Sequence, residues 1–185
     1  MTVGIENGSI IREDSSGDSG YWRIHRANAL TDLGQQDGGL AAGMNPDGNQ
    51  IGGWYYGNSN LRYGRIFQIR DDWDNASDIV IEIEFCTWSA ATPPGDVVFP
   101  IYVRAQANGS ESYTTLTVSD ATTQVGGATA YHKNLATTTI SSGDVSPGDY
   151  LQIGVAFDPV SSDVSATIFQ GLIVKYKTKY PTEEV

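Results

Sequence analysis

Two carboxylates on one face of a predicted strand are the first candidates for chemistry. Glu82 and Glu84 stand two positions apart in the segment 78–88, which alternates apolar with polar residues. Such side chains lie ~7 Å apart along a strand, and glycosidases use two carboxyl groups at roughly 5–10 Å. Catalytic pairs, however, usually come from different strands that face each other across a cleft. We therefore interpret Glu82 and Glu84 as a solvent-facing strand surface or a subunit contact, and keep glycan hydrolysis only as an alternative.

Nucleophilic and zinc chemistry have few residues to draw on. The chain has two histidines, His25 and His132, and one cysteine, Cys86. A catalytic triad needs a nucleophile, a base and an orienting acid, and a zinc site needs several Cys or His ligands. Cys86 lies in an apolar strand pattern, which predicts a small core or rim side chain, and a single cysteine forms no intramolecular disulfide. We therefore predict no enzymatic activity and no firm metal site.

Two short acidic loops offer oxygen ligands. Asp14 and Asp18 stand in a loop rich in glycine and serine, and Asp71, Asp72 and Asp74 follow one another closely. Calcium accepts about six to eight oxygens from such loops, although neither loop matches the EF-hand pattern. The alternative is that these acids are simply solvated. No cofactor is predicted, and calcium at these two loops is the one candidate.

Aromatic residues are the other feature suited to ligand binding. Trp54, Tyr55 and Tyr56 precede a turn of glycine and asparagine, and Trp73 lies in the acidic loop. Flat rings beside amides and carboxylates stack on sugar faces while the polar groups bond hydroxyls. The alternative is that the rings fill the core, as aromatics in strands commonly do. Adjacent strand residues point to opposite faces, so either Trp54 or Tyr55 must face outward or into a partner. We take the four residues as candidates for stacking on a glycan.

The charge balance disfavours two kinds of partner. The formal net charge is −11, from 22 acidic and 11 basic residues. The basic residues are not clustered: Arg62, Arg65 and Arg70 are diluted by the acids that follow. Duplex nucleic acid needs a basic face that displaces counterions, and an anionic membrane surface needs a similar attraction. We therefore predict no direct binding to nucleic acid or membranes. We also predict no signal peptide, and no membrane span, because no apolar stretch approaches ~18 residues.

Period-two alternation of apolar residues runs through most of the chain. The clearest case is 78–88, where Ile79, Ile81, Ile83 and Phe85 share one face. Turns rich in glycine and proline separate the strands, and strands without intervening helices pair antiparallel. Strands are predicted at 21–26, 51–56, 61–69, 78–88, 97–107, 113–118, 130–140, 150–157 and 164–180. Further predictions are a pairing of the second and third strands across residues 57–60, a turn at Asn108-Gly109, a loop at 119–128 and a bulge at Gly171.

These elements predict an all-β protein, an antiparallel β-sandwich for which jelly-roll topology is favoured. With 185 residues the chain fits a single domain. We assign residues 1–20 to an N-terminal arm or edge segment, 21–180 to the sandwich, and 181–185 to a polar tail. Only 18% of the residues are charged. The resulting hydrogen-bonding surface suits contact with carbohydrate or packing against neighbouring subunits.

Four segments resemble tailed-phage virion proteins of the jelly-roll type. The segments are DIVIEIEF at 78–85, PGDVVFPIYVRA at 94–105, SPGDYLQIGVAF at 146–157 and GLIVKYKTKY at 171–180. The resemblance implies a virion structural protein, for capsid decoration, stabilisation or a fibre, that is assembled in the host cytoplasm. The implied partners are other copies of the chain, in a trimer or another ring, and capsid or fibre subunits. A lectin-like carbohydrate-binding module is the alternative function, and a virion protein that binds host glycans would combine the two.

Overall fold

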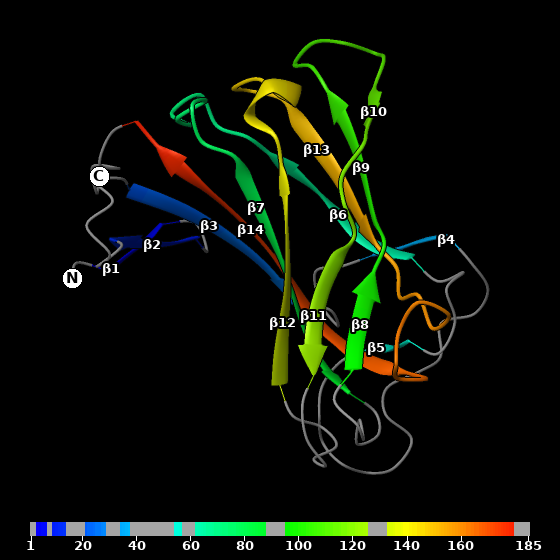
Figure 1. Ribbon diagram of the computed structural model, residues 1–185. Coiled ribbons are helices and arrows are strands. Elements are labelled where there is room, and N and C mark those ends of the chain that lie inside the picture. The colour runs from blue at the N-terminus through cyan, green and yellow to red at the C-terminus, as the bar shows by residue number, and fades with distance from the viewer. Residues whose placement is uncertain are drawn as a thin grey trace.

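The computed structural model of the chain describes residues 3–6, 9–13, 21–28, 34–37, 54–56, 62–87, 95–125 and 133–179. These residues are almost entirely strands and turns (Figure 1). The strands are β1 (Val3–Glu6), β2 (Ser9–Glu13), β3 (Tyr21–Asn28), β4 (Gly34–Asp37), β5 (Trp54–Tyr56), β6 (Arg62–Gln68), β7 (Ile79–Thr87), β8 (Gly95–Phe99), β9 (Ile101–Gln106), β10 (Thr114–Leu116), β11 (Ala121–Val125), β12 (Lys133–Ile140), β13 (Tyr150–Val155) and β14 (Thr167–Thr178). Within these ranges the helical segment is a single 3₁₀ turn, η1 (Ser142–Asp144), which is too short to cross a membrane.

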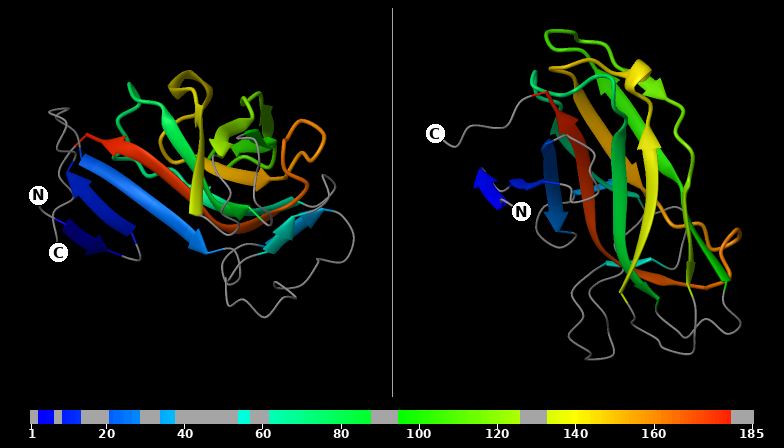
Figure 2. Two further views of the ribbon diagram at one scale, coloured as in Figure 1. Left: turned by 60° about the horizontal axis from the view of Figure 1, so that its bottom comes forward. Right: turned by 60° about the vertical axis from the view of Figure 1, so that its left-hand side comes forward.

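The strands form two sheets that pack against each other (Figures 1 and 2). The large sheet has the order β1-β2-β3-β14-β7-β12-β11-β8, with β5 paired to β14. The small sheet has the order β10-β9-β13-β6-β4. Neighbouring strands in the described ranges pair antiparallel, and the chain crosses between the sheets from β6 to β7 and from β13 to β14. The prediction of an all-β antiparallel sandwich of jelly-roll type is therefore confirmed.

The apolar face of β7 lies in the centre of the core. Ile79, Ile81, Ile83 and Phe85 are fully buried, as their alternation predicted. Burial of each such side chain contributes about 1.5–3 kcal/mol. The Phe85 ring meets the ring of Phe99 from β8 edge to face, with 4.8 Å between the centroids. These residues belong to one buried cluster with the inward side chains of the small sheet, so the core joins the two layers.

Pro100 divides the segment that we predicted as one strand at 97–107. β8 pairs with β11 in the large sheet, whereas β9 pairs with β10 and β13 in the small sheet. Proline has no N–H to donate to a ladder, so the chain passes from one sheet to the other at this residue. The carbonyl of Pro100 still accepts the N–H of Ala156 at 3.0 Å. The predicted inward positions from Val97 to Ala105 remain buried on both sides of the break.

Two strands that we predicted to pair across residues 57–60 belong to different sheets. β5 pairs with β14, whereas β6 pairs with β13 and β4. Both strands exist, but the predicted pairing is wrong, because alternation specifies the buried face of a strand and not its neighbour. The predicted loop at 119–128 is also partly wrong, since Ala121–Val125 forms β11. Only its two terminal residues, Ala121 and Val125, are buried and apolar, so the alternation that predicts a strand is weak in this segment.

The C-terminal strand is irregular at the glycine where we predicted a bulge. The pairing register between β14 and β7 shifts between Phe169 and Gly171. A Cβ atom at Gly171 would lie 3.0 Å from the carbonyl oxygen of Ala27 and 3.1 Å from Oε2 of Glu84. Neighbouring strands thus approach this backbone closely, which is a typical reason for glycine within a strand.

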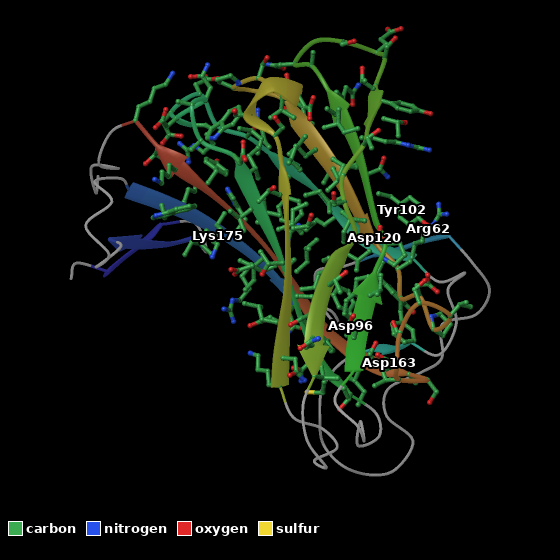
Figure 3. The ribbon with its side chains drawn as sticks, viewed as in Figure 1. Arg62, Asp96, Tyr102, Asp120, Asp163 and Lys175 are labelled. Atoms are coloured by element: carbon green, nitrogen blue, oxygen red, sulfur yellow. The ribbon has the colours of Figure 1, made fainter. Side chains whose placement is uncertain are left out.

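A loop covers the outer edge of β8. The N–H of Asp96 donates to Oδ2 of Asp163 at 2.7 Å, and the N–H of Val98 donates to Oγ of Ser162 at 2.9 Å (Figure 3). The carbonyls of the same two strand residues accept backbone N–H groups of Asp163 and Asp158. An uncovered edge strand invites pairing with another chain. In this protein the loop after β13 takes the place of such a partner.

Candidate functional site

A groove lies on the outer face of the small sheet. Its volume is about 220 Å³. Figure 3 shows Arg62 and Tyr102 close together on the small-sheet side of the molecule. Side chains and backbone from β6, β9, β10 and β13 line the groove: Arg62, Ile101, Tyr102, Val103, Arg104, Thr115, Leu116 and Gln152.

Strand β9 supplies the centre of this face. Its residues alternate between the core and the surface: Ile101, Val103 and Ala105 are buried, whereas Tyr102 and Arg104 are exposed. Two side chains on the same face of a strand are ~7 Å apart. Tyr102 and Arg104 therefore stand side by side on the surface while their neighbours hold β9 to the core.

The pairing register surrounds Arg104 with neutral polar groups. Gln152 of β13 and Thr115 of β10 are its partners on the two sides. Directly opposed residues of adjacent antiparallel strands share a face of the sheet. An amide and a hydroxyl, each able to donate and to accept hydrogen bonds, consequently flank the guanidinium group.

Two arginines lie against tyrosine rings on this face. The guanidinium carbon of Arg62 is 3.8 Å from the ring centroid of Tyr102, and that of Arg104 is 4.6 Å from the centroid of Tyr113. Such contacts contribute about 0.5–1 kcal/mol at exposed sites. They also restrict two long side chains that would otherwise sample many rotamers. Tyr113 is 58% exposed, so its ring is presented to solvent together with the cation.

Glycine on β13 permits the first of these contacts. In the pairing register Gly154 is the partner of Tyr102 on one side and of Gly64 on the other. Glycine has no Cβ atom, so no side chain at these two positions stands beside the ring. Arg62 of β6 therefore reaches Tyr102 of β9 across the intervening strand.

The aromatic residues that we predicted as stacking candidates lie elsewhere. Trp54–Tyr56 forms β5 in the large sheet, and its side chains are outside the described part of the structure. Trp73 is fully buried, so the prediction of an exposed ring at this position is wrong. A tight turn, in which the N–H of Trp73 donates to the carbonyl of Arg70 at 3.1 Å, returns the indole to the core.

The acids that we predicted as calcium candidates are Asp14, Asp18, Asp71, Asp72 and Asp74, of which the first two lie outside the described residues. Asp72 is engaged by Arg23, with 2.6 Å between its Oδ2 and Nη2 of the arginine. Oδ1 of Asp74 accepts the N–H of Ala76 within a turn. In the described ranges, no group of three or more His, Cys, Asp or Glu residues is arranged to hold a metal ion.

The two glutamates of β7 point away from the core and are paired within their own sheet. Glu82 is bound by Lys175 of β14. Oε1 of Glu84 lies 2.9 Å from Nζ of Lys133 and 3.3 Å from Nη1 of Arg26. Glu84 is 8% exposed, so its partners cover it, and the prediction of a solvent-facing carboxylate is wrong for this residue. Lys175 and Lys133 come from the strands on either side of β7, and Arg26 comes from β3, the next strand beyond β14 in the same sheet, so none of these partners comes from across a cleft.

His25 contacts both sheets near their edge. Its ring lies 6.2 Å from that of Phe67, centroid to centroid, and its Nε2 is 3.4 Å from the hydroxyl of Tyr176. Burial, reinforced by the charge of Arg23, lowers the pKa of His25 from 6.5 to about 4, so the imidazole is neutral at neutral pH. Cys86 is 2% exposed, which confirms a core side chain, and burial raises the pKa of its thiol.

The residues around the groove were missed by the sequence analysis. Tyr102 and Arg104 occupy outward positions of the segment 97–107, and only its inward residues were used to predict a strand. Their alternation with buried residues was a usable signal. No signal in the sequence indicated that Arg62, Thr115 and Gln152 belong to the same site, because these residues meet Arg104 and Tyr102 only through strand pairing.

No protein-family model matches the sequence, and no curated protein matches it. Among solved structures, the chain is similar to the N-terminal CBM22-1–GH10 modules of endo-1,4-β-D-xylanase 10B from Clostridium thermocellum, complexed with xylohexaose, with 13% identity and a TM-score of 0.36. That match covers 86% of this chain and 27% of the xylanase chain. A second similar structure is the xylan-binding module CBM15, with 11% identity, a TM-score of 0.34, and coverage of 80% of this chain and 98% of that one.

A third similar structure is the TNF Eiger from S. frugiperda, with 9% identity, a TM-score of 0.25, and coverage of 71% of this chain and 96% of that one. All three TM-scores are low. The ligands and partners of these proteins are therefore not carried over to this chain.

Proposed function

We propose that this protein is a non-enzymatic binding domain that holds a carbohydrate on the outer face of the small sheet. The observation that supports this function most directly is the groove itself. In it, the pair Arg62–Tyr102 and Arg104 stand beside an amide and a hydroxyl, and Arg104 also contacts the ring of Tyr113 next to the groove.

The chemistry of the groove matches the surface of a sugar ring. A pyranose has apolar C–H faces and a rim of hydroxyl groups that both donate and accept hydrogen bonds. Tyr102 and Tyr113 offer exposed ring surface for the faces, and Gln152 and Thr115 offer groups that also donate and accept. A wholly apolar ligand would cover these polar groups without satisfying them, which is costly.

The size of the groove favours a short stretch of saccharide. Its volume is about 220 Å³, whereas enclosed pockets for small molecules usually have roughly 300–1,000 Å³. An open, shallow groove on a sheet face lets a longer polymer continue beyond it at both ends. The function that fits is contact with a few sugar units of a glycan and not enclosure of a small substrate.

A glycan array probed with labelled protein tests this function, followed by calorimetry with the best ligand. We expect Tyr113→Ala and Gln152→Ala each to weaken binding about tenfold, which corresponds to a loss of about 1.4 kcal/mol. The matched control is Tyr150→Ala. Tyr150 is exposed on the same sheet face but does not line the groove, and Tyr113, unlike Tyr150, contacts an arginine that does.

Circular dichroism of each variant shows whether the fold is kept. A protein that binds no glycan on the array would contradict the proposal. Equal losses in the Tyr150 variant and in the Tyr113 and Gln152 variants would contradict the location of the site.

A second proposal is assembly into a virion, as the resemblance of the four segments implies. One feature of the small sheet favours it: within the described residues β10 pairs only with β9 and ends the sheet. An open edge is a template for pairing with another subunit, either a copy of this chain or a capsid or fibre protein. Size-exclusion chromatography with light scattering checks self-assembly across a range of concentrations, and a strict monomer throughout would contradict it.

A further inference from the structure

Positive charges on the two outer faces have different surroundings. On the large sheet, two lysines and an arginine pair with the carboxylates of Glu82 and Glu84. On the small sheet, Arg104 has no carboxylate partner among the described residues, and its guanidinium lies against the ring of Tyr113. The exposed charge of Arg104 is therefore available to a ligand.

Contact with an aromatic ring leaves the donors of Arg104 available to a stronger acceptor. A guanidinium group is planar, and its N–H groups point outward in that plane. The carbon of this group lies 4.6 Å from the centroid of the Tyr113 ring, and the face of a ring is a far weaker acceptor than a carboxylate. A carboxylate binds in the plane through two parallel N–H···O hydrogen bonds. The ring thus restrains the guanidinium group, and its N–H groups can still donate to a carboxylate.

The groove holds a positive charge at Arg104. The described residues that line it include no aspartate or glutamate, on a chain with a formal net charge of −11. An anion is repelled by the molecule as a whole and attracted at this place. The hydroxyls of a neutral glycan that covered Arg104 would accept hydrogen bonds from it but would leave its charge unneutralised, which is less favourable. A carboxylate on the ligand supplies that compensation.

We infer that the groove selects acidic saccharides, glycans whose sugar units carry a carboxylate, with Arg104 holding that group. This inference rests on the proposed function, since it names the class of carbohydrate. Gln152 and Thr115, the pairing partners of Arg104, then bond hydroxyls next to the carboxylate.

Three acidic polysaccharides, each beside its carboxyl-reduced form, test the inference. Polygalacturonate, alginate and hyaluronate are titrated into the protein by calorimetry at roughly 50 mM and roughly 300 mM NaCl, since salt screens exposed charges. We expect at least one acidic polymer to bind about tenfold or more tightly than its reduced form. We also expect that binding to weaken several-fold at the higher salt concentration.

Two arginine variants separate the site from general charge effects. Arg104→Gln should weaken binding of the acidic polymer about tenfold. Arg65→Gln makes the same change in charge on the same sheet, at an exposed residue that does not line the groove, and should bind like the unmodified protein. Equal losses in the two variants would overturn the role of Arg104.

The remaining outcomes distinguish this inference from the proposed function. Equal affinity for each acidic polymer and its reduced form would overturn acid selectivity and leave carbohydrate binding in place. If none of the acidic polymers binds, the inference fails, and the neutral glycans of the array decide on the function separately. Poly-L-glutamate that binds as tightly as the best polysaccharide would show recognition of charge alone, and would likewise overturn the inference.

Discussion

The guanidinium group of Arg62 lies 3.8 Å from the ring centroid of Tyr102, although β13 separates the two strands that carry these residues. The contact spans β6 and β9 on the outer face of the small sheet and orients a ring that lines the groove. Because Gly154 is the pairing partner of Tyr102, the arginine meets no side chain there. The candidate site therefore depends on the alignment of three strands and not on a local sequence motif.

The ring of Tyr102 is expected to matter more than its hydroxyl. Tyr102→Leu removes the aromatic surface and the partner of Arg62, and should weaken saccharide binding about tenfold, or about 1.4 kcal/mol. Tyr102→Phe keeps the ring and should bind within about threefold of the unmodified protein. Calorimetry with the best ligand of the array measures both. A loss in the phenylalanine variant as large as that in the leucine variant would show that the hydroxyl makes the decisive contact.

Asp72 neutralises a buried cation. Arg23 is 3% exposed, and its Nη2 lies 2.6 Å from Oδ2 of Asp72. Asp72→Ala leaves that charge buried without its partner, so we expect the free energy of unfolding to fall by about 2–3 kcal/mol. Urea denaturation followed by tryptophan fluorescence measures the change. The neighbouring exposed residue offers a control, Asp71→Ala, which should change stability by less than about 0.5 kcal/mol; similar effects of the two variants would refute the role of Asp72.

The loop that covers β8 requires a glycine at the start of that strand. A Cβ atom at Gly95 would lie 2.2 Å from Cβ of Asp163. Gly95→Ala must displace Asp163 and break its hydrogen bond to the N–H of Asp96, which should lower the free energy of unfolding by about 1–3 kcal/mol.

A glycine with room around it provides the comparison for Gly95. At Gly143 the nearest atom to an added Cβ would be Oγ of Ser141, at 3.8 Å, an ordinary contact distance. Gly143→Ala should therefore leave the thermal midpoint almost unchanged. Equal thermal midpoints for Gly95→Ala and the unmodified protein would mean that the loop moves away without cost.

His25 should make the protein less stable in mild acid. Its pKa is lowered from 6.5 to about 4 in the folded state, by burial and then by the charges of Arg23, Arg70 and Arg65, against which Asp72 acts. Between these two pH values the unfolded chain binds more protons than the folded chain. The free energy of unfolding therefore rises with pH across this window. The stability that His25 contributes is lost as the pH falls through the same window.

The effect of His25 is on the order of 2 kcal/mol after allowance for its partial exposure. Urea denaturation of the unmodified protein and of His25→Gln, measured from pH 7 down to pH 4, isolates it, because other titrating groups act equally on both. We expect the difference in unfolding free energy between the unmodified protein and His25→Gln to change between pH 6.5 and about pH 4. Parallel curves would mean that His25 is protonated freely in the folded protein.

Local pattern was enough to predict the buried faces of single strands. Ile79 and Phe85 lie inside as their alternation indicated, and Gly171 lies at the register shift of β14. Local pattern was not enough to assign strands to sheets. The strand at Trp54 and the strand at Arg62 were both predicted, yet they belong to different sheets. Pairing is decided by long-range contacts, which the period of a strand does not encode.

The candidate site also shows that local pattern predicts the face of a strand but not its neighbours. Trp73 was a reasonable ligand contact by its type and its acidic neighbours, and it lies in the core, because a turn and not an alternating pattern directs its side chain. Tyr102 and Arg104 were readable as outward residues of a strand, but nothing in their own segment connects them to Arg62 or Gln152.

The amino-acid sequence by itself determined that this chain folds into antiparallel strands with one apolar face each, since side chains alternate along any extended backbone. It also determined the acidic balance of the surface, with a formal net charge of −11. Only the tertiary structure decided which side chains meet. Strand order places Arg62 on Tyr102 and sets Gln152 and Thr115 beside Arg104, because the register across a sheet is set by the packing of the whole core.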